Sequence, residues 1–154
     1  MQRHGPAGEL ADVITPNLTE AALLLGQPYE TLPAGGRPPG DHGAAEPGRA
    51  AVCGADGRFS GPGRTGAVCF DARTGKTEAV QTAYVAHEFH GTGDVFSSVL
   101  TGALVRGVLS SAAGEAAAFV RACAERTATE DLPMREGVDF EPLLGLLIPG
   151  KETV

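Results

Sequence analysis

Basic side chains are scarce in this sequence: 12 Lys and Arg residues stand against 19 Asp and Glu residues, which gives a net charge of −7 at pH 7. A protein that binds nucleic acid neutralises phosphates with a stripe of basic residues, and no segment here supplies one. The sequence also lacks a run of about 18 apolar residues, which a membrane-spanning helix needs. We therefore expect neither nucleic acid nor a membrane as a partner.

Cysteine is rare as well, and the residues Cys53, Cys69 and Cys123 lack the spacing of a metal site. Free thiols are typical of a reducing compartment. Residues 1–8 contain no apolar stretch of the kind that a signal peptide needs, and we expect them to form a disordered lead-in. These features predict a cytoplasmic protein.

Glycine and proline are abundant, with 22 and 11 residues among 154. Many of them fall within residues 31–49, where the composition cannot sustain a helix or a strand, so we expect a flexible loop there. The hydrophobic fraction of 42% is that of a soluble globular protein. The length predicts a single domain with a real core.

Apolar patterning in the rest of the chain alternates between strand and helix. Short apolar runs predict strands at residues 10–14, 50–53, 66–70 and 78–84, and helical periodicity predicts helices at residues 19–26, 94–106, 110–126 and 140–147. Strands that alternate with helices predict an α/β sheet covered by helices. The strands are few and short for such a sheet, which indicates that the chain is part of a larger fold.

The segment His90–Phe96 combines two glycines, a carboxylate and the start of an apolar helix. Gly91 and Gly93 let the backbone turn tightly and approach an anion closely, and the helix start offers amide groups and a positive dipole end. Asp94 either caps the helix or acts as a base on a nearby hydroxyl. Together these groups suggest phosphoryl transfer to an alcohol.

Asn17 and Glu20 form a second polar group, at the turn between the first predicted strand and the first predicted helix. A helix cap with an acidic residue in the first turn accounts for both residues, and it is the simpler interpretation. The alternative is a polar pair that holds Mg²⁺ and its waters near phosphate oxygens.

Three segments, taken in order, are similar to a known family: residues 11–21, residues 90–107 and residues 137–141. They resemble the C-terminal half of the pyridoxal/pyridoxamine kinases of the ribokinase-like superfamily. The resemblance covers most of this chain and about half of such a kinase. It implies a partial ribokinase-like three-layer α/β/α sandwich that spans residues 1–154 and lacks the N-terminal half.

The resemblance also implies a role for each residue of the glycine-rich segment. Asp94 would be the base that takes a proton from the 5′-hydroxymethyl group of the B6 vitamer. Gly91, Thr92 and Gly93 would form the anion hole for the γ-phosphoryl group as charge develops during transfer. The implied cofactors are ATP and Mg²⁺.

In the same way, the resemblance assigns the nucleotide side of the site to residues near the first strand-to-helix turn. Asn17 and Glu20 would organise Mg²⁺ through water, and Thr15 would lie beside the nucleotide. Cys53 stands where the family usually has a Thr-Gly or Lys-type phosphate contact, so that a thiol replaces a hydroxyl at that position.

We therefore expect a truncated or split enzyme that phosphorylates pyridoxamine or pyridoxal with ATP, as in vitamin B6 salvage. The expected protein partner is a second copy, giving a homodimer, or a complementing N-terminal half. An unpaired apolar edge strand around Val13 and Ile14 would favour self-association. Two alternatives stay open: a non-catalytic kinase remnant or interaction module, and a related hydroxymethylpyrimidine or sugar kinase.

Overall fold

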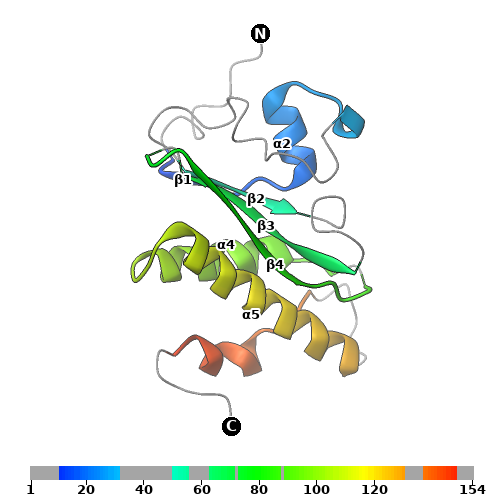
Figure 1. Ribbon diagram of the computed structural model, residues 1–154. Coiled ribbons are helices and arrows are strands. Elements are labelled where there is room, and N and C mark those ends of the chain that lie inside the picture. Colours follow the sequence, from blue (N-terminus) through cyan, green and yellow to red (C-terminus); the bar gives the residue numbers. More distant parts are fainter. Residues whose placement is uncertain are drawn as a thin grey trace. The chain divides into compact units, whose positions relative to one another are not determined.

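The computed structural model describes residues 11–31, 50–55, 63–71, 73–87, 89–130 and 137–148. They belong to two compact units that divide between Gln81 and Thr82, and each unit is described by itself. The first unit contains a sheet and a helix, and the second contains mainly helices (Figure 1). This mixture confirms the α/β class expected from the sequence.

The sheet has the strand order β1-β2-β3-β4. β1 (Val13–Ile14) lies at its edge and runs parallel to β2 (Ala50–Ala55), with Val13 opposite Ala50. Parallel neighbours need a crossover connection, and helix α2 (Leu18–Leu25) belongs to the crossover between these two strands. Both residues of β1 are half-buried, as expected for a strand that covers part of a core.

β2 pairs with the antiparallel β3 (Arg64–Asp71), which a short turn joins to β4 (Lys76–Ala83). In that turn the Gly75 N–H donates to the last carbonyl of β3 at 2.7 Å. Gly66 of β3 lies so close to β4 that a Cβ atom would come within 2.0 Å of the Val80 carbonyl oxygen. Glycine at this position therefore permits an approach that a side chain would prevent.

α2 begins and ends where its flanking residues predict. Asn17 caps its N-terminus, and Gly26 ends it in the left-handed conformation with φ 63°. The buried side chains on its inner face are those of Leu18, Ala21 and Ala22. Tyr29, in the 3-10 helix η1 (Tyr29–Thr31), packs against them and closes this small core.

Two helices dominate the second unit, α4 (Thr92–Leu104) and α5 (Leu109–Thr129), and they pack against each other after a short connection. Alanines are prominent among the buried side chains of α5, and side chains this small permit close packing. The most buried of them, each at most 2% exposed, are Ala112, Ala113 and Ala116. The buried residues of α4 are Val99, Leu100 and Ala103.

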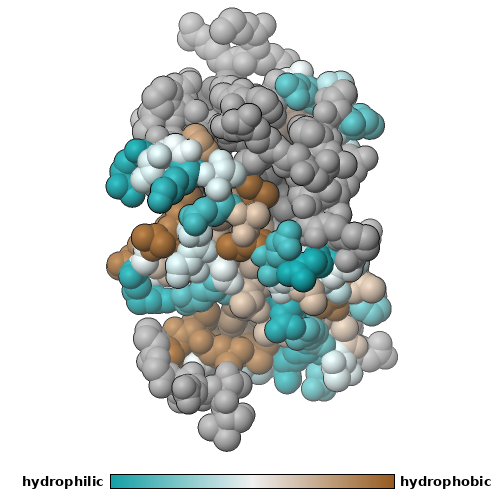
Figure 2. Space-filling model, in the orientation of Figure 1, coloured by the Kyte–Doolittle hydropathy of each residue, from teal (hydrophilic) through white to brown (hydrophobic). Residues whose placement is uncertain are grey.

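The short helix predicted at residues 140–147 is a 3-10 helix, η4 (Glu141–Leu147). Pro142 stands in its first turn, where the missing N–H costs no hydrogen bond. Seven residues with an internal glycine give little support to an α-helix, so the tighter 3-10 form is favoured. Apolar surface stays exposed around η4 (Figure 2), from the side chains of Leu144, Leu146 and Ile148.

The other predicted elements are confirmed with small shifts of their ends, namely the strands at 10–14, 50–53, 66–70 and 78–84 and the helices at 19–26, 94–106 and 110–126. The lead-in predicted at residues 1–8 lies outside the described residues, as does the loop predicted at 31–49 beyond Thr31. The single domain expected from the length stays a prediction. Among the helices that the structure describes, none is both long and apolar enough to cross a bilayer.

Candidate active site

Helix α4 begins with a glycine turn. Gly91 immediately precedes the first helical residue and has φ 78° and ψ −1°, in the left-handed region that glycine adopts freely. No side chain caps the helix. The possibility that Asp94 is the cap is therefore wrong, because the chain enters the helix at Gly91 and Asp94 falls within the first helical turn.

The first turn of α4 contains the backbone amides that the resemblance to pyridoxal kinases assigns to an anion hole. The Val95 N–H donates to the Gly91 carbonyl at 3.1 Å, which is the first bond of the helix. The amides before it have no acceptor within an α-helix. Gly91, Thr92 and Gly93 thus present N–H groups at the positive end of the helix dipole, where negative charge is stabilised.

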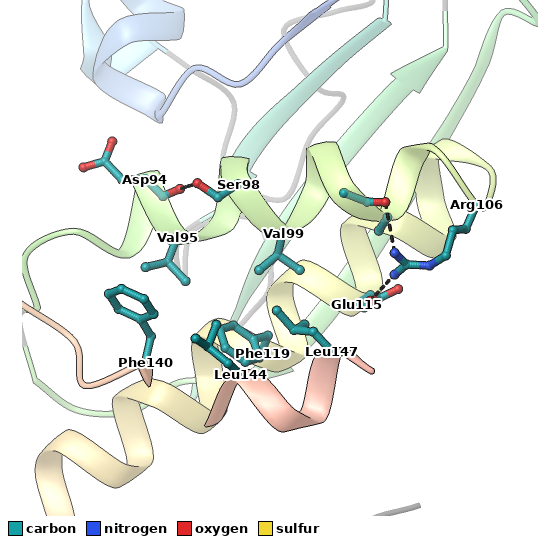
Figure 3. Close-up of a pocket in the computed structure, with 12 residues that line it drawn as sticks. Asp94, Val95, Ser98, Val99, Arg106, Glu115, Phe119, Phe140, Leu144 and Leu147 are labelled. Atoms are coloured by element: carbon teal, nitrogen blue, oxygen red, sulfur yellow. Dashed lines mark hydrogen bonds and ion pairs between the residues drawn. The ribbon is translucent and has the colours of Figure 1, made fainter. Parts of the chain in front are cut away.

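Asp94 is exposed in the same turn. Its carboxylate points away from the neighbouring apolar side chains (Figure 3), while its backbone carbonyl accepts a 2.8 Å hydrogen bond from the Ser98 hydroxyl. Among the described residues, no side chain forms a hydrogen bond or ion pair with this carboxylate. A carboxylate in this environment is available to accept a proton from a substrate hydroxyl.

Asn17 and Glu20 form a complete capping box at the start of α2. The Glu20 N–H donates to Asn17 Oδ1 at 2.8 Å, and the Asn17 N–H donates to Glu20 Oε2 at 2.9 Å. The helix cap favoured by the sequence is confirmed. Both side chains are exposed, so their remaining oxygen lone pairs face solvent and can accept hydrogen bonds from water.

The sequence-predicted site residues fall into two sets. Thr15, Asn17 and Glu20 lie in the first unit, and residues 91–94 lie in the second, so the structure brings together the members of each set. Cys53 is in β2 with its backbone opposite Val68, and its side chain lies outside the described residues. Across the part of the chain that the structure describes, no three His, Cys, Asp or Glu side chains cluster to hold a metal.

A pocket of about 360 Å³ lies beside Asp94, among α4, α5 and η4 (Figure 3). Apolar side chains line most of it, and the ion pair between Arg106 and Glu115, with an N–O distance of 2.7 Å, lies at one end. Its volume is in the range of small-molecule sites. The apolar lining residues are Val95, Val99, Ala103, Phe119, Phe140, Leu144 and Leu147.

The two cysteines whose side chains are described, Cys69 and Cys123, lack the features of reactive thiols. Cys69 and Cys123 are free and buried. Burial raises the pKa of each thiol to about 11, with a smaller contribution from Glu78 at Cys69 and from Asp139 at Cys123. Both thiols are therefore protonated at neutral pH and are poor nucleophiles.

One group of polar residues was not singled out by sequence reasoning. Thr127, near the end of α5, is only 1% exposed, and its hydroxyl donates to the Cys123 carbonyl at 2.7 Å and accepts from the Asp139 N–H at 2.9 Å. Arg126 donates from Nε to Asp139 Oδ2 at 2.7 Å. The sequence signal for this group is that Asp139 lies within residues 137–141, one of the three segments that resemble the kinase family.

A family model described as phosphomethylpyrimidine kinase matches residues 7–137. A search of curated protein sequences finds no match.

Several solved structures are similar to the chain. Pyridoxal kinase from Lactobacillus plantarum is 28% identical, with a TM-score of 0.74, and the match covers 89% of this chain and 49% of that one. A putative phosphomethylpyrimidine kinase from Bacteroides thetaiotaomicron, in a crystal form with pyridoxal, is 27% identical, with a TM-score of 0.74 and coverage of 92% and 51%. An ADP complex of Bacillus subtilis pyridoxal kinase, 24% identical with a TM-score of 0.56, shares the fold over 76% of this chain and 45% of that one.

The chain thus spans about half the length of the solved structures that it matches. The similarity confirms the resemblance to pyridoxal kinases and the ribokinase-like α/β fold expected from the sequence.

Proposed function

Because the chain belongs to the phosphomethylpyrimidine kinase family, we propose that it carries the phosphoryl-transfer site of a kinase that uses ATP to phosphorylate the hydroxymethyl group of pyridoxamine or pyridoxal. The start of α4 supports this most strongly, because left-handed Gly91 brings unpaired helix amides and the carboxylate of Asp94 into one turn. This part of the site would act together with the other half of such a kinase.

The proposed chemistry follows from these groups. As the substrate hydroxyl oxygen attacks the γ-phosphorus, Asp94 accepts the hydroxyl proton. The bond from the γ-phosphorus to the bridging oxygen breaks, and ADP leaves with that electron pair. The amides of Gly91, Thr92 and Gly93 donate to the oxygens of the transferred group, whose charge the helix dipole also stabilises.

Asn17 and Glu20 would hold Mg²⁺ through water. Amide and carboxylate oxygens suit this ion, which usually keeps several waters in its shell. In the capping box each side chain already uses an oxygen to bind a backbone amide, and both are exposed, so the pair fits a water-mediated ion better than direct ligation. When bound, the ion neutralises charge on the phosphates. Thr15 and Cys53 would contact the nucleotide.

The B6 vitamer is favoured as the substrate because one matched structure is a pyridoxal kinase and another contains pyridoxal. The family model favours a second candidate, a hydroxymethylpyrimidine, which offers the same kind of primary alcohol on a heteroaromatic ring.

The free, buried Cys69 and Cys123 fit a cytoplasmic enzyme. A second copy of the chain, or a complementing N-terminal half, would be its protein partner.

Because the chain would act with the other half of such a kinase, the proposal is tested by incubating it together with the N-terminal half of a pyridoxal kinase, ATP, Mg²⁺ and either pyridoxamine or hydroxymethylpyrimidine. Phosphorylated product is followed by mass spectrometry. Turnover that disappears in Asp94→Asn, and persists in the exposed control Glu125→Gln, supports the assigned base. Turnover that survives Asp94→Asn contradicts it. Binding is followed separately by titrating ATP against the amide NMR signals of Gly91 and Gly93, and the absence of both turnover and signal changes would count against the whole proposal.

A further inference from the structure

A second glycine packs against the turn that begins α4. Gly137 adopts a left-handed conformation with φ +86°, and a Cβ atom on it would lie 3.3 Å from the His90 carbonyl oxygen. The α-carbon of Gly137 therefore lies against the peptide that joins His90 to Gly91. A side chain at position 137 would have to shift that carbonyl by a few tenths of an ångström and would also strain its own backbone.

The closeness of Gly137 to the His90 oxygen has a consequence for the Gly91 amide. The carbonyl of His90 and the N–H of Gly91 belong to one planar peptide unit, and in a trans peptide they point in opposite directions. When the oxygen is held on one side, the direction of the Gly91 N–H is fixed on the other. The Gly91 N–H is one of the donors assigned to the anion hole.

The segment that carries Gly137 is itself held by the end of α5. The Asp139 N–H donates to the Thr127 hydroxyl at 2.9 Å, and that hydroxyl donates to the Cys123 carbonyl at 2.7 Å. Arg126 adds a hydrogen bond from Nε to Asp139 Oδ2 at 2.7 Å. Because Thr127 is only 1% exposed, water has little access to replace its bond to Asp139.

We propose that Thr127 and Arg126 are positioning residues that act through Asp139 and Gly137 to fix the orientation of the His90–Gly91 peptide. Thr127 holds the segment 137–139 against α5 through its hydrogen bond to Asp139. Gly137, in that segment, lies close to the His90 carbonyl and so limits the direction in which the Gly91 N–H points. The catalytic consequence rests on the proposed function, whereas the geometric statement concerns the folded chain alone and needs no ligand.

The first test compares two glycines that both have positive φ. Gly137→Ala adds a methyl group against the His90 oxygen, whereas Gly75→Ala, at φ +68°, adds one where nothing lies within 4 Å. Both variants carry the strain of a side chain at positive φ, and only Gly137→Ala also adds a contact with the His90 oxygen. The expected result is displacement of the Gly91 and Gly93 amide NMR signals in Gly137→Ala and wild-type signals in Gly75→Ala. Wild-type signals for the turn in a folded Gly137→Ala chain would overturn the proposal.

The second test uses Thr127 and does not depend on the stability of the glycine variants. Thr127→Ser keeps the hydroxyl, and Thr127→Val keeps the shape but removes it. We expect the Gly91 and Gly93 signals to move in Thr127→Val and to return to wild-type positions in Thr127→Ser. If the Asp139 signal moves in Thr127→Val while the Gly91 signal stays, the segment does not position the turn and the inference fails.

These readouts separate the inference from the proposed kinase activity. In the kinase assay, Thr127→Val is expected to lower kcat at least tenfold with little change in the KM for ATP, and Thr127→Ser to restore it. NMR signals that respond as expected in a chain without turnover would support the inference and count against the function. Turnover that depends on Asp94, together with a turn unaffected by Gly137→Ala and Thr127→Val, would support the function and overturn the inference.

Discussion

Asn17 and Glu20 bind each other's backbone in both directions at the start of α2, through hydrogen bonds of 2.8 and 2.9 Å. This reciprocity satisfies two amides that the helix itself leaves without acceptors. It also means that the same two side chains assigned to Mg²⁺ already have a structural role. Substitutions at the pair can therefore separate the contribution to stability from the contribution to metal binding.

Glu20→Gln is expected to keep the cap and to weaken the metal site. The glutamine oxygen can still accept from the Asn17 N–H, so the free energy of unfolding should change by less than about 0.5 kcal/mol. Loss of the negative charge should raise the Mg²⁺ concentration needed for half-maximal turnover. Asn17→Ala, which removes the cap, should lower the free energy of unfolding by about 1 kcal/mol in chemical denaturation. An unchanged Mg²⁺ dependence in Glu20→Gln would leave the pair with a capping role alone.

Gly93→Ala should affect activity without destabilising the chain. Gly93 is helical, and a Cβ atom there would meet nothing within 4 Å, so alanine should leave the free energy of unfolding unchanged or raise it by up to about 1 kcal/mol. A methyl group beside the amide would obstruct a phosphoryl group that approaches the backbone, and turnover should fall at least tenfold. Gly102→Ala, in open space later in the same helix, is the matched control. Equal turnover by Gly93→Ala and Gly102→Ala would show that the transferred phosphoryl group does not approach Gly93.

Local patterns were sufficient to predict most elements of this fold. The spacing of Asn17 and Glu20 predicted the cap of α2 because all of its bonds join residues three apart. The start of α4 was placed two residues too late, because aspartate is a preferred N-cap residue whereas this helix begins after a left-handed Gly91, an unusual conformation for an N-cap. The bond between Thr127 and Asp139 depends on tertiary packing, which local periodicity does not encode.

The buried thiols should make the chain less stable in alkaline solution. Burial raises the pKa of Cys123 to about 11, whereas the thiol of the unfolded chain ionises near its ordinary value of 9.0. Between these values the folded chain keeps a proton that the unfolded chain loses, so the free energy of unfolding falls as pH rises from about 9 to about 11. The slope is at most about 1.4 kcal/mol per pH unit for each thiol. Denaturation of Cys123→Ala across this range should give a shallower slope than wild type, and an equal slope would show that this thiol does not contribute.

Self-association should occur through one of two apolar surfaces, and each can be tested by adding a charge. β1 is an edge strand whose outer backbone groups can pair with another chain, while Leu144 is 48% exposed on η4. If the sheet edge is responsible, Ile14→Lys should lower the weight-average mass in sedimentation equilibrium and Leu144→Lys should not. If η4 is responsible, the two variants should behave in the opposite way. We expect the edge strand to dominate, because it offers backbone hydrogen bonds as well as apolar contact, and a wild-type chain that stays monomeric at millimolar concentration would refute both.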